Sequence, residues 1–244
     1  LVETLVAVAP EIQASIAVET DGIGIAIANV LVALHGLSGI SLRHSPPPWP
    51  TSIPADAPHL KAQMTPYQGD ILNRILGEPS LCSELLRLSR RWQGMAVVHG
   101  DIRWENLLAA ADGRATGVAL LDWESAGLGL PEWDVGCAIA AYLGEWIFST
   151  PAIGGRVLLS ESGYVFETAR RSVRQLWERY AQSSRGRTVT LLDAIQWAGV
   201  RLLAMTFERS RYEHISWPAV CCMQLGANCV TDPEQCEAAL CEAA

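Results

Sequence analysis

The chain has 244 residues, half of them hydrophobic and 18% charged, and its formal net charge is -8. High apolar content with low charge excludes intrinsic disorder over the whole length, so a packed core is expected. The acidic balance, with no dense basic block, excludes a nucleic-acid binder that works by neutralising phosphates.

The first half of the chain carries two helical patterns with a proline-rich stretch between them. Apolar residues recur at helical spacing over 26–34, and Gly36 predicts the end of this helix. Six prolines fall within 44–60, so neither a helix nor a central strand is expected there. A second helix is predicted over 81–92, where one face carries Leu81, Leu85, Leu88 and Trp92.

The apolar period then changes to that of short strands. A run at 95–98 predicts a strand, and the runs 107–108 and 118–121 flank Asp112-Gly113, which favours a β-hairpin. The helical period returns after the hairpin in two stripes, 165–180 and 191–205. The predicted fold class is therefore α+β and mainly helical, with a small β-hairpin inserted between helices.

Membrane and export signals are missing from the sequence. No apolar run reaches about 18 residues, the least that a membrane-spanning helix needs, and the first residues lack the basic region of a signal peptide. The seven cysteines include no pair with the C-x-x-C spacing of a zinc site. We therefore expect a cytoplasmic protein with reduced, mostly buried thiols, and neither membrane nor nucleic acid among its partners.

The most informative residues surround the hairpin. Asp101 follows the short strand directly, Asn106 opens the outgoing strand, and Asp122 ends the return strand. The start of one antiparallel strand lies beside the end of the other, so Asn106 and Asp122 should converge, with Asp101 facing the same point. Two oxygen ligands beside a free carboxylate suit Mg²⁺ that also binds phosphates. The arrangement predicts phosphoryl transfer from a nucleotide to a hydroxyl.

Three stretches of the sequence together form a motif set. They read H-G-D-x-x-x-x-N from His99 to Asn106, D-W-E from Asp122, and G-x-P-x-x-D from Gly129 to Asp134. On these stretches the chain resembles the aminoglycoside phosphotransferase and choline kinase family, over about residues 26 to 210. Segment 31–37, L-V-A-L-H-G-L, is similar to the first helix of that family's C-terminal lobe. The resemblance implies a protein-kinase-like fold, of which this chain holds the C-terminal lobe.

The resemblance also implies roles for individual residues. Asp101 is the expected catalytic carboxylate that orients and deprotonates the acceptor hydroxyl, while Asn106 and Asp122 bind the metal and, with it, the nucleotide. His99 and Asp134 are expected to support the loop rather than to react. The implied cofactors are ATP and Mg²⁺.

Other residues of the motif region leave alternatives open. Arg103 either contacts the transferred phosphate, as a further catalytic residue, or pairs with Glu105 or Glu124. Glu124 is expected to bind a cation or a backbone amide rather than the metal. Three tryptophans should wall the site, although tryptophan is also a normal packing residue: Trp104, Trp123 and Trp133.

Members of this family have an N-terminal β-lobe that covers the nucleotide phosphates. Only residues 1–25 precede the helix at Ala26, so this lobe is expected to be largely absent from the chain. The expected division is a remnant of that lobe or hinge at 1–25, a kinase-like C-terminal lobe at 26–220, and a cysteine-bearing tail at 221–244.

The expected function is that of an ATP-dependent O-phosphotransferase. The acceptor is a hydroxyl on a small molecule or on Ser or Thr of a natural-product precursor peptide, and the acidic net charge favours a cationic acceptor. The alternative is a non-catalytic kinase-like subunit that binds a partner protein through its apolar C-terminal helices.

Overall fold

The computed structural model describes residues 22–39, 41–109, 118–150, 152–153, 156–157, 164–183, 188–210 and 216–241. Its helices are α2 (Ile23–His35), α3 (Ile53–Ala62), α4 (Pro66–Leu76), α5 (Pro79–Arg91), α6 (Pro131–Phe148), α7 (Phe166–Ala181), α8 (Leu191–Arg209), α9 (Trp217–Thr231) and α10 (Pro233–Cys241). Its strands are β1 (Ala96–Val98), β2 (Leu107–Ala109), β3 (Val118–Leu120), β4 (Gly127–Gly129), β5 (Ala152–Ile153) and β6 (Arg156–Val157). The mainly helical fold class is confirmed.

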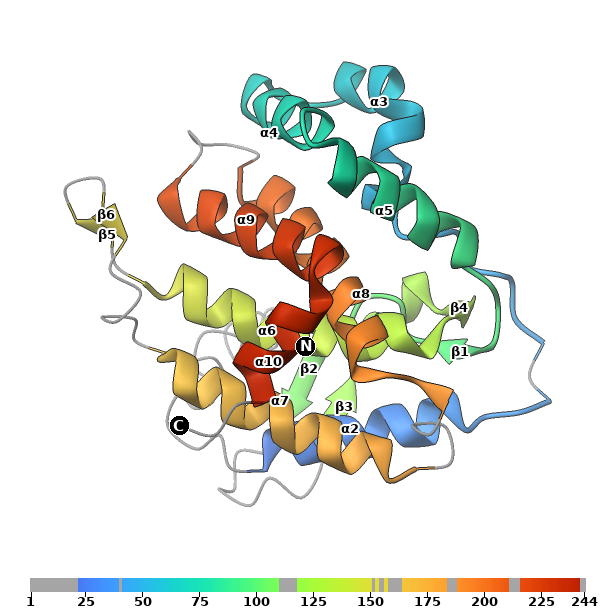
Figure 1. Cartoon of the computed structure of the whole chain (residues 1–244). Helices are drawn as coiled ribbons and strands as arrows, with labels where there is room; N and C mark the ends of the chain where they lie inside the picture. Colours follow the sequence, from blue (N-terminus) through green and yellow to red (C-terminus); the bar gives the residue numbers. More distant parts are fainter. Residues whose placement is uncertain are drawn as a thin grey trace, which may run out of the picture.

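Helices α6 and α8 pack against each other at the centre of the fold (Figure 1). Helix α6 is buried along most of its length. A Cβ atom at Gly136 of α6 would meet the Ala194 carbonyl oxygen and the Ala198 nitrogen of α8, each at 2.7 Å. Only glycine permits so close a crossing. The crossing fixes the first turn of α6, which carries Asp134, relative to α8.

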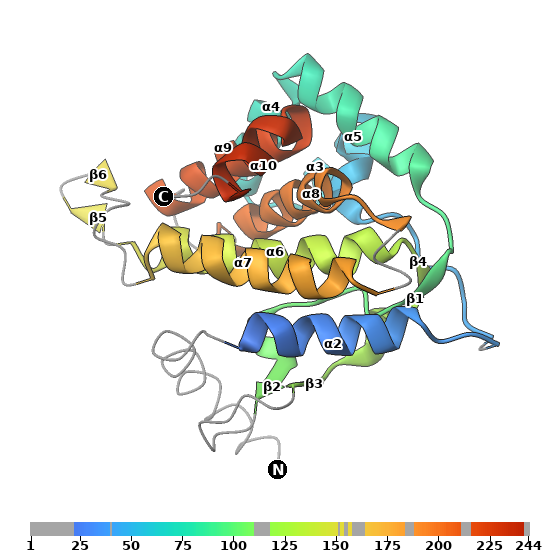
Figure 2. The ribbon, with the colours of Figure 1, turned by 60° about the horizontal axis from the view of Figure 1, so that its bottom comes forward.

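Helices α2 and α7 form a layer beside this centre, and the hairpin β2–β3 lies against α2 on its other side (Figure 2). Helix α2 confirms the helix predicted over 26–34, and it ends at His35, directly before Gly36. Helices α7 and α8 confirm the two stripes predicted at 165–180 and 191–205. Both helices bury apolar residues at these spacings, so the pattern reports burial and not only propensity.

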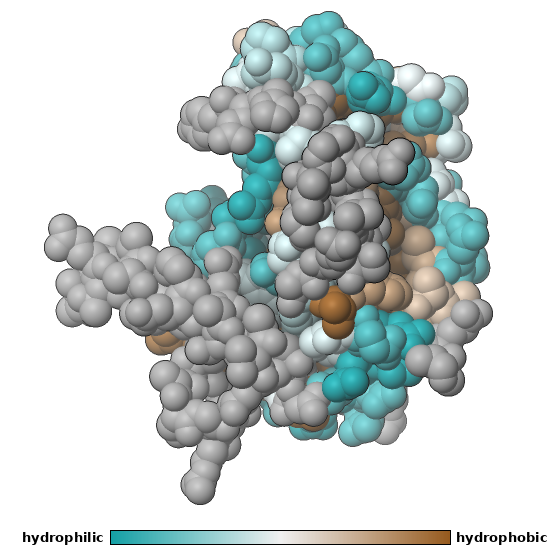
Figure 3. Space-filling model, turned by 90° about the vertical axis from the view of Figure 1, so that its left-hand side faces the viewer, coloured by the Kyte–Doolittle hydropathy of each residue, from teal (hydrophilic) through white to brown (hydrophobic). Residues whose placement is uncertain are grey.

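Helices α9 and α10 cover the outer side of α8. Helix α9 runs across the boundary expected at 220/221, and its Cys222 and Cys229 are buried. All seven cysteines are free thiols; three are buried and Cys241 is exposed. Among the described helices, none combines the length and apolar character needed to cross a membrane. On the face shown in Figure 3, most of the described residues that project outward are hydrophilic. Apolar residues show mainly in the gaps between these projecting residues.

The expectation for 44–60 is wrong in its second half, because α3 begins at Ile53. Pro54 lies in the first turn of α3, where a helix has no partner for the N–H that proline lacks. Asp56 leaves helical geometry with φ −123° and ψ 19°, and this kink accommodates Pro58 two residues later.

The strands form small antiparallel pairs. The predicted hairpin is confirmed, with Leu107 opposite Leu120 and Ala109 opposite Val118. Its Asp112-Gly113 turn lies outside the described residues. Strand β1 confirms the run predicted at 95–98, but it pairs with β4, a strand that the sequence did not predict.

Candidate active site

The hairpin places Asn106 and Asp122 beside each other. The Leu121 N–H donates to the Asn106 carbonyl oxygen at 2.9 Å, which extends the ladder by one pair beyond Leu107 and Leu120. Asp122 follows this pair directly in left-handed geometry, with φ 60° and ψ 69°. The structure therefore brings the outgoing and return ends of the hairpin together, as the sequence predicts.

Gly100 makes the turn that presents Asp101. Its φ is +87°, and a Cβ atom there would meet the Ser125 carbonyl oxygen at 2.7 Å, so only glycine fits. The Trp133 indole N–H donates to the Gly100 carbonyl oxygen at 2.9 Å. The loop is thus pinned immediately before the expected catalytic carboxylate.

Asp134 holds the same loop by hydrogen bonds to its backbone. Its side chain is fully buried and accepts hydrogen bonds from the backbone N–H groups of His99 at 2.7 Å and Gly100 at 2.9 Å. His35 Nε2 lies 3.2 Å from the Asp134 carboxylate, and His35 Nδ1 lies 2.8 Å from the Tyr180 hydroxyl. One buried carboxylate therefore connects the loop to α2 and α7.

His99 joins the two halves of the site. Its Nε2 lies 2.8 Å from the Leu121 carbonyl oxygen, and the Asp101 N–H donates to its Nδ1 at 3.3 Å. These partners fit a neutral imidazole that carries its proton on Nε2. The ring also packs edge-on against Trp123 at 4.8 Å between centroids. His99 thereby fixes the backbone next to both Asp101 and Asp122.

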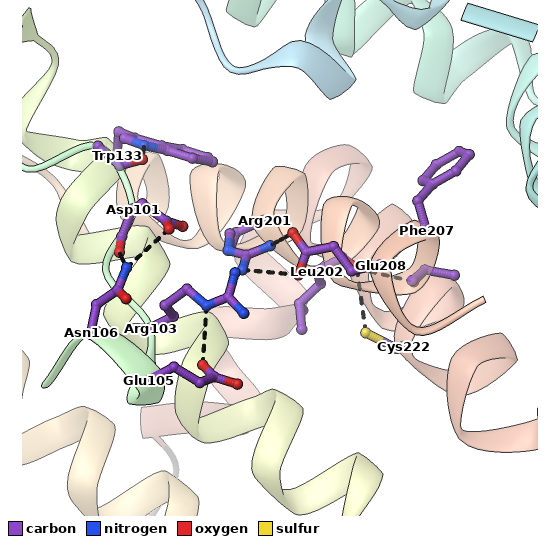
Figure 4. Close-up of polar contacts among 12 residues, drawn as sticks. Asp101, Arg103, Glu105, Asn106, Trp133, Arg201, Leu202, Phe207, Glu208 and Cys222 are labelled. Atoms are coloured by element: carbon purple, nitrogen blue, oxygen red, sulfur yellow. Dashed lines mark hydrogen bonds and ion pairs between the residues drawn. The ribbon is translucent and has the colours of Figure 1, made fainter. Parts of the chain in front are cut away.

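Asn106 contacts Asp101 directly. Its amide Nδ2 donates to the Asp101 carbonyl oxygen at 2.9 Å and to Asp101 Oδ2 at 3.0 Å (Figure 4). Both bonds use the amide nitrogen and leave the Asn106 Oδ1 atom for another partner. Asp122 is exposed. An amide oxygen beside the Asp101 carboxylate fits Mg²⁺, which prefers oxygen ligands. Among the described residues, no three His, Cys, Asp or Glu side chains cluster as a metal site.

Arg103 forms an ion pair with Glu105, with 3.1 Å between Nε and Oε2. Burial acts to lower the pKa of Arg103, but the hydrogen bond and charge of Glu105 outweigh it and raise the pKa above its ordinary value. Burial likewise acts to raise the pKa of Glu105, and its hydrogen bonds and the charge of Arg103 reverse this. Glu124 is exposed, and its backbone oxygen accepts a hydrogen bond from Arg43 at 2.7 Å.

Two pockets flank the loop. The larger, of about 580 Å³, is lined by Asp101, Glu124 and Trp133, and by the segment 43–50. This segment runs alongside β4, since Leu128 exchanges backbone hydrogen bonds of 2.9 Å with Arg43 and Ser45. The smaller pocket, of about 270 Å³, is lined by Arg103, Trp104 and Glu105, together with residues of α6 and α8. Trp133 and Trp104 therefore each wall one pocket, whereas Trp123 is 46% exposed.

Sequence reasoning missed two residues that line both pockets, Arg201 and Glu208. A signal was present in the stripe of α8. Arg201 follows Ala194 and Ala198 at helical spacing and precedes Met205, so a charged residue stands where the pattern requires an apolar one.

A supported loop carboxylate, an adjacent amide and a second carboxylate at the end of a hairpin are the arrangement that the sequence analysis expects of a phosphoryl-transfer centre. The chain belongs to the phosphotransferase enzyme family, whose model matches residues 7–176. This confirms the resemblance on which the sequence analysis relied.

Among solved structures, the chain is similar to the choline kinase LicA from Streptococcus pneumoniae. The two share 16% sequence identity and superpose with a TM-score of 0.48, over 89% of this chain and 65% of that kinase. The chain thus spans 65% of the length of the kinase that it matches. A comparison with curated proteins gives no match.

Proposed function

We propose that this chain carries the catalytic centre of an ATP-dependent O-phosphotransferase. The acceptor is a hydroxyl on a small molecule or on Ser or Thr of a precursor peptide. The observation that carries the proposal is the contact of Asn106 with Asp101, because it leaves the amide oxygen of Asn106 available next to the Asp101 carboxylate. The Asp122 turn supports it, since Asp122 follows the residue that pairs with Asn106. The seven free thiols fit a reducing compartment, so we expect the activity in the cytoplasm.

Each residue has a defined task in the proposed reaction. Asp101 orients the acceptor hydroxyl and takes its proton as the acceptor oxygen bonds to the γ-phosphorus of ATP. The bond between that phosphorus and the β,γ-bridging oxygen breaks, and ADP leaves. Asn106 and Asp122 would hold Mg²⁺, which neutralises charge on the phosphates when it is bound.

The loop contacts explain why such a centre is kept rigid. His99 and Asp134 fix the backbone that leads into Asp101 through hydrogen bonds that do not depend on substrate. Pre-positioning of a base lowers the entropy lost on reaching the reactive geometry. Arg103 is paired with Glu105. We expect its side chain to contact the transferred phosphoryl group only after this ion pair has opened.

Calorimetric titration of ATP with Mg²⁺ tests the proposal, with Asp122→Ala as the comparison variant. We expect binding by the wild-type chain and its loss in Asp122→Ala. Asp122 is exposed, so the variant is expected to fold, and circular dichroism checks this. Equal binding by both chains would remove Asp122 from the nucleotide site. Absence of binding by the wild type at millimolar nucleotide would favour the non-catalytic, partner-binding alternative.

A further inference from the structure

An ion pair on α8 lies next to the proposed base. Arg201 Nη1 and Nη2 donate to Glu208 Oε1 and Oε2 at 2.8 Å and 3.2 Å, a two-pronged pair between residues seven positions apart. Burial acts to lower the pKa of Arg201, but the charge and hydrogen bonds of Glu208 outweigh it, with smaller contributions from Cys137 and Asp101, and raise the pKa. Arg201 is therefore a permanent cation close to Asp101.

This pair separates the two pockets. Arg201 and Glu208 are the two described residues that line both, while Asp101 lines the larger pocket and Arg103 the smaller. In Figure 4 the Arg201 guanidinium lies between the carboxylates of Asp101 and Glu208, and the Arg103 guanidinium lies beside it. If Glu208 moved away, the two pockets would join next to Asp101 and Arg201 would face the combined space.

The two partners differ in their access to water. Arg201 is only 5% exposed, whereas the Glu208 side chain is 45% exposed and belongs to the penultimate residue of α8. A buried guanidinium without an anionic partner costs several kcal/mol, but a half-exposed carboxylate returns to water at little cost. Another anion can therefore displace Glu208 as the partner of Arg201. The Arg201 guanidinium itself stays buried and keeps needing an anionic partner.

We propose that Arg201 determines acceptor specificity by binding an anionic group of the acceptor, a carboxylate above all, in place of Glu208. This inference rests on the proposed phosphotransferase function and names the class of its substrate. In the bound acceptor, the reacting hydroxyl points toward Asp101. The carboxylate of the acceptor, a few bonds away, lies on the opposite side of the Arg201 guanidinium. The planar guanidinium matches both oxygens of a carboxylate, as it does those of Glu208.

A cationic acceptor fits this position less well. It would contact the outer side of Glu208, leave the ion pair closed and use only the larger pocket. The net charge of the whole chain, which favours cations, is a weaker guide than the buried cation beside the reacting group, because surface charges are screened within about 10 Å. Acceptor choice then depends on whether the pair opens.

The test is a calorimetric comparison of two hydroxyl compounds that differ only in charge, 4-hydroxybutyrate and 4-hydroxybutyramide. Wild type should prefer the acid. Glu208→Gln removes the competing carboxylate, so it should bind the acid about tenfold more tightly than wild type, with little change for the amide. Arg201→Lys keeps the charge but loses the two-pronged geometry, so it should lose most of the preference.

The matched control is Arg91→Gln. Arg91 forms an ion pair with Asp193 at the other end of α8, at 2.7 Å, and lines neither pocket. Arg91→Gln should leave the affinities for the acid and the amide unchanged. It therefore separates the effect of losing any ion pair on α8 from the effect of losing the Arg201–Glu208 pair. Thermal unfolding of each variant checks folding.

Equal affinity of Glu208→Gln for acid and amide, or no binding of either, overturns the inference. Its failure is distinguishable from failure of the proposed function, because the titrations contain no nucleotide. Binding of the acid by Arg201 without any ATP binding would reject the phosphotransferase proposal alone. ATP binding without any preference for the acid would reject only the role of Arg201.

Discussion

Removal of the Asp134 carboxylate is expected to destabilise the chain through two backbone groups. Asp134 is fully buried and accepts from the N–H groups of His99 and Gly100 at 2.7 Å and 2.9 Å. In Asp134→Ala these donors lose their acceptor inside the protein, at about 1–3 kcal/mol each. The expected loss in unfolding free energy is therefore about 2–6 kcal/mol, a large share of the roughly 5–15 kcal/mol that stabilises a typical domain.

Glu132 provides a matched control in the same helical turn. It is also buried, but its Oε2 atom has no hydrogen-bond partner among the described residues. Burial raises the pKa of Glu132 above its ordinary value. Since the folded-state pKa is raised, the penalty on the ionised side chain is absent below the unfolded pKa and grows as pH rises through the folded one. Glu132→Gln should therefore stabilise the chain at neutral pH, and this gain should vanish below about pH 4.

Urea unfolding at pH 7 and in acid measures both effects, and unchanged m values show that the unfolded state is comparable. Two buried acids two residues apart are thus expected to move stability in opposite directions. If Asp134→Ala cost less than about 1 kcal/mol, or if both variants destabilised equally at pH 7, the hydrogen bonds to Asp134 would not be what holds the loop.

Three further predictions concern the loop itself. Gly100→Ala should cost about 2 kcal/mol or more, since φ +87° and the 2.7 Å approach to the Ser125 oxygen both exclude a Cβ atom; urea unfolding near that of wild type would contradict this. Asp101→Asn should reduce phosphoryl transfer by about 10²–10⁴-fold with ATP binding retained, measured with radiolabelled ATP and an acceptor panel; unchanged turnover would remove Asp101 as the base. His99→Phe keeps an aromatic ring but leaves the Leu121 oxygen and the Asp101 N–H without their partner. Thermal unfolding should therefore show a loss of about 2–4 kcal/mol in the free energy of unfolding. An unchanged stability would contradict the role of His99 in holding the loop.

The parts of the site that could be predicted are those set by local chemistry. Asp101, Asn106 and Asp122 follow from residue type and position on a short hairpin, whose register makes neighbours of positions that are distant in the chain.

The parts that could not be predicted depend on long-range packing. The course of segment 43–50 is set by pairing with Leu128, which no local pattern signals. The start of α3 inside a proline-rich stretch depends on where each proline falls relative to the first turn and the kink at Asp56. The ion pair of Arg201 joins residues of one helix, but its importance arises only because α8 passes beside the loop that carries Asp101.

The strained positions of the loop indicate where ligand binding is prepared before a ligand arrives. Asp122 is the one non-glycine residue with positive φ in the described part of the chain, and such a conformation costs about 1–3 kcal/mol. Gly100, also left-handed, stands next to Asp101. The bonds of His99 to Asp101 and Leu121, which flank these two turns, and of Asp134 to Gly100 offset that cost in the folded chain. The Asp101 carboxylate and the backbone turn at Asp122 are therefore held in place by hydrogen bonds already formed on folding, which leaves less ordering to be done when nucleotide and acceptor bind.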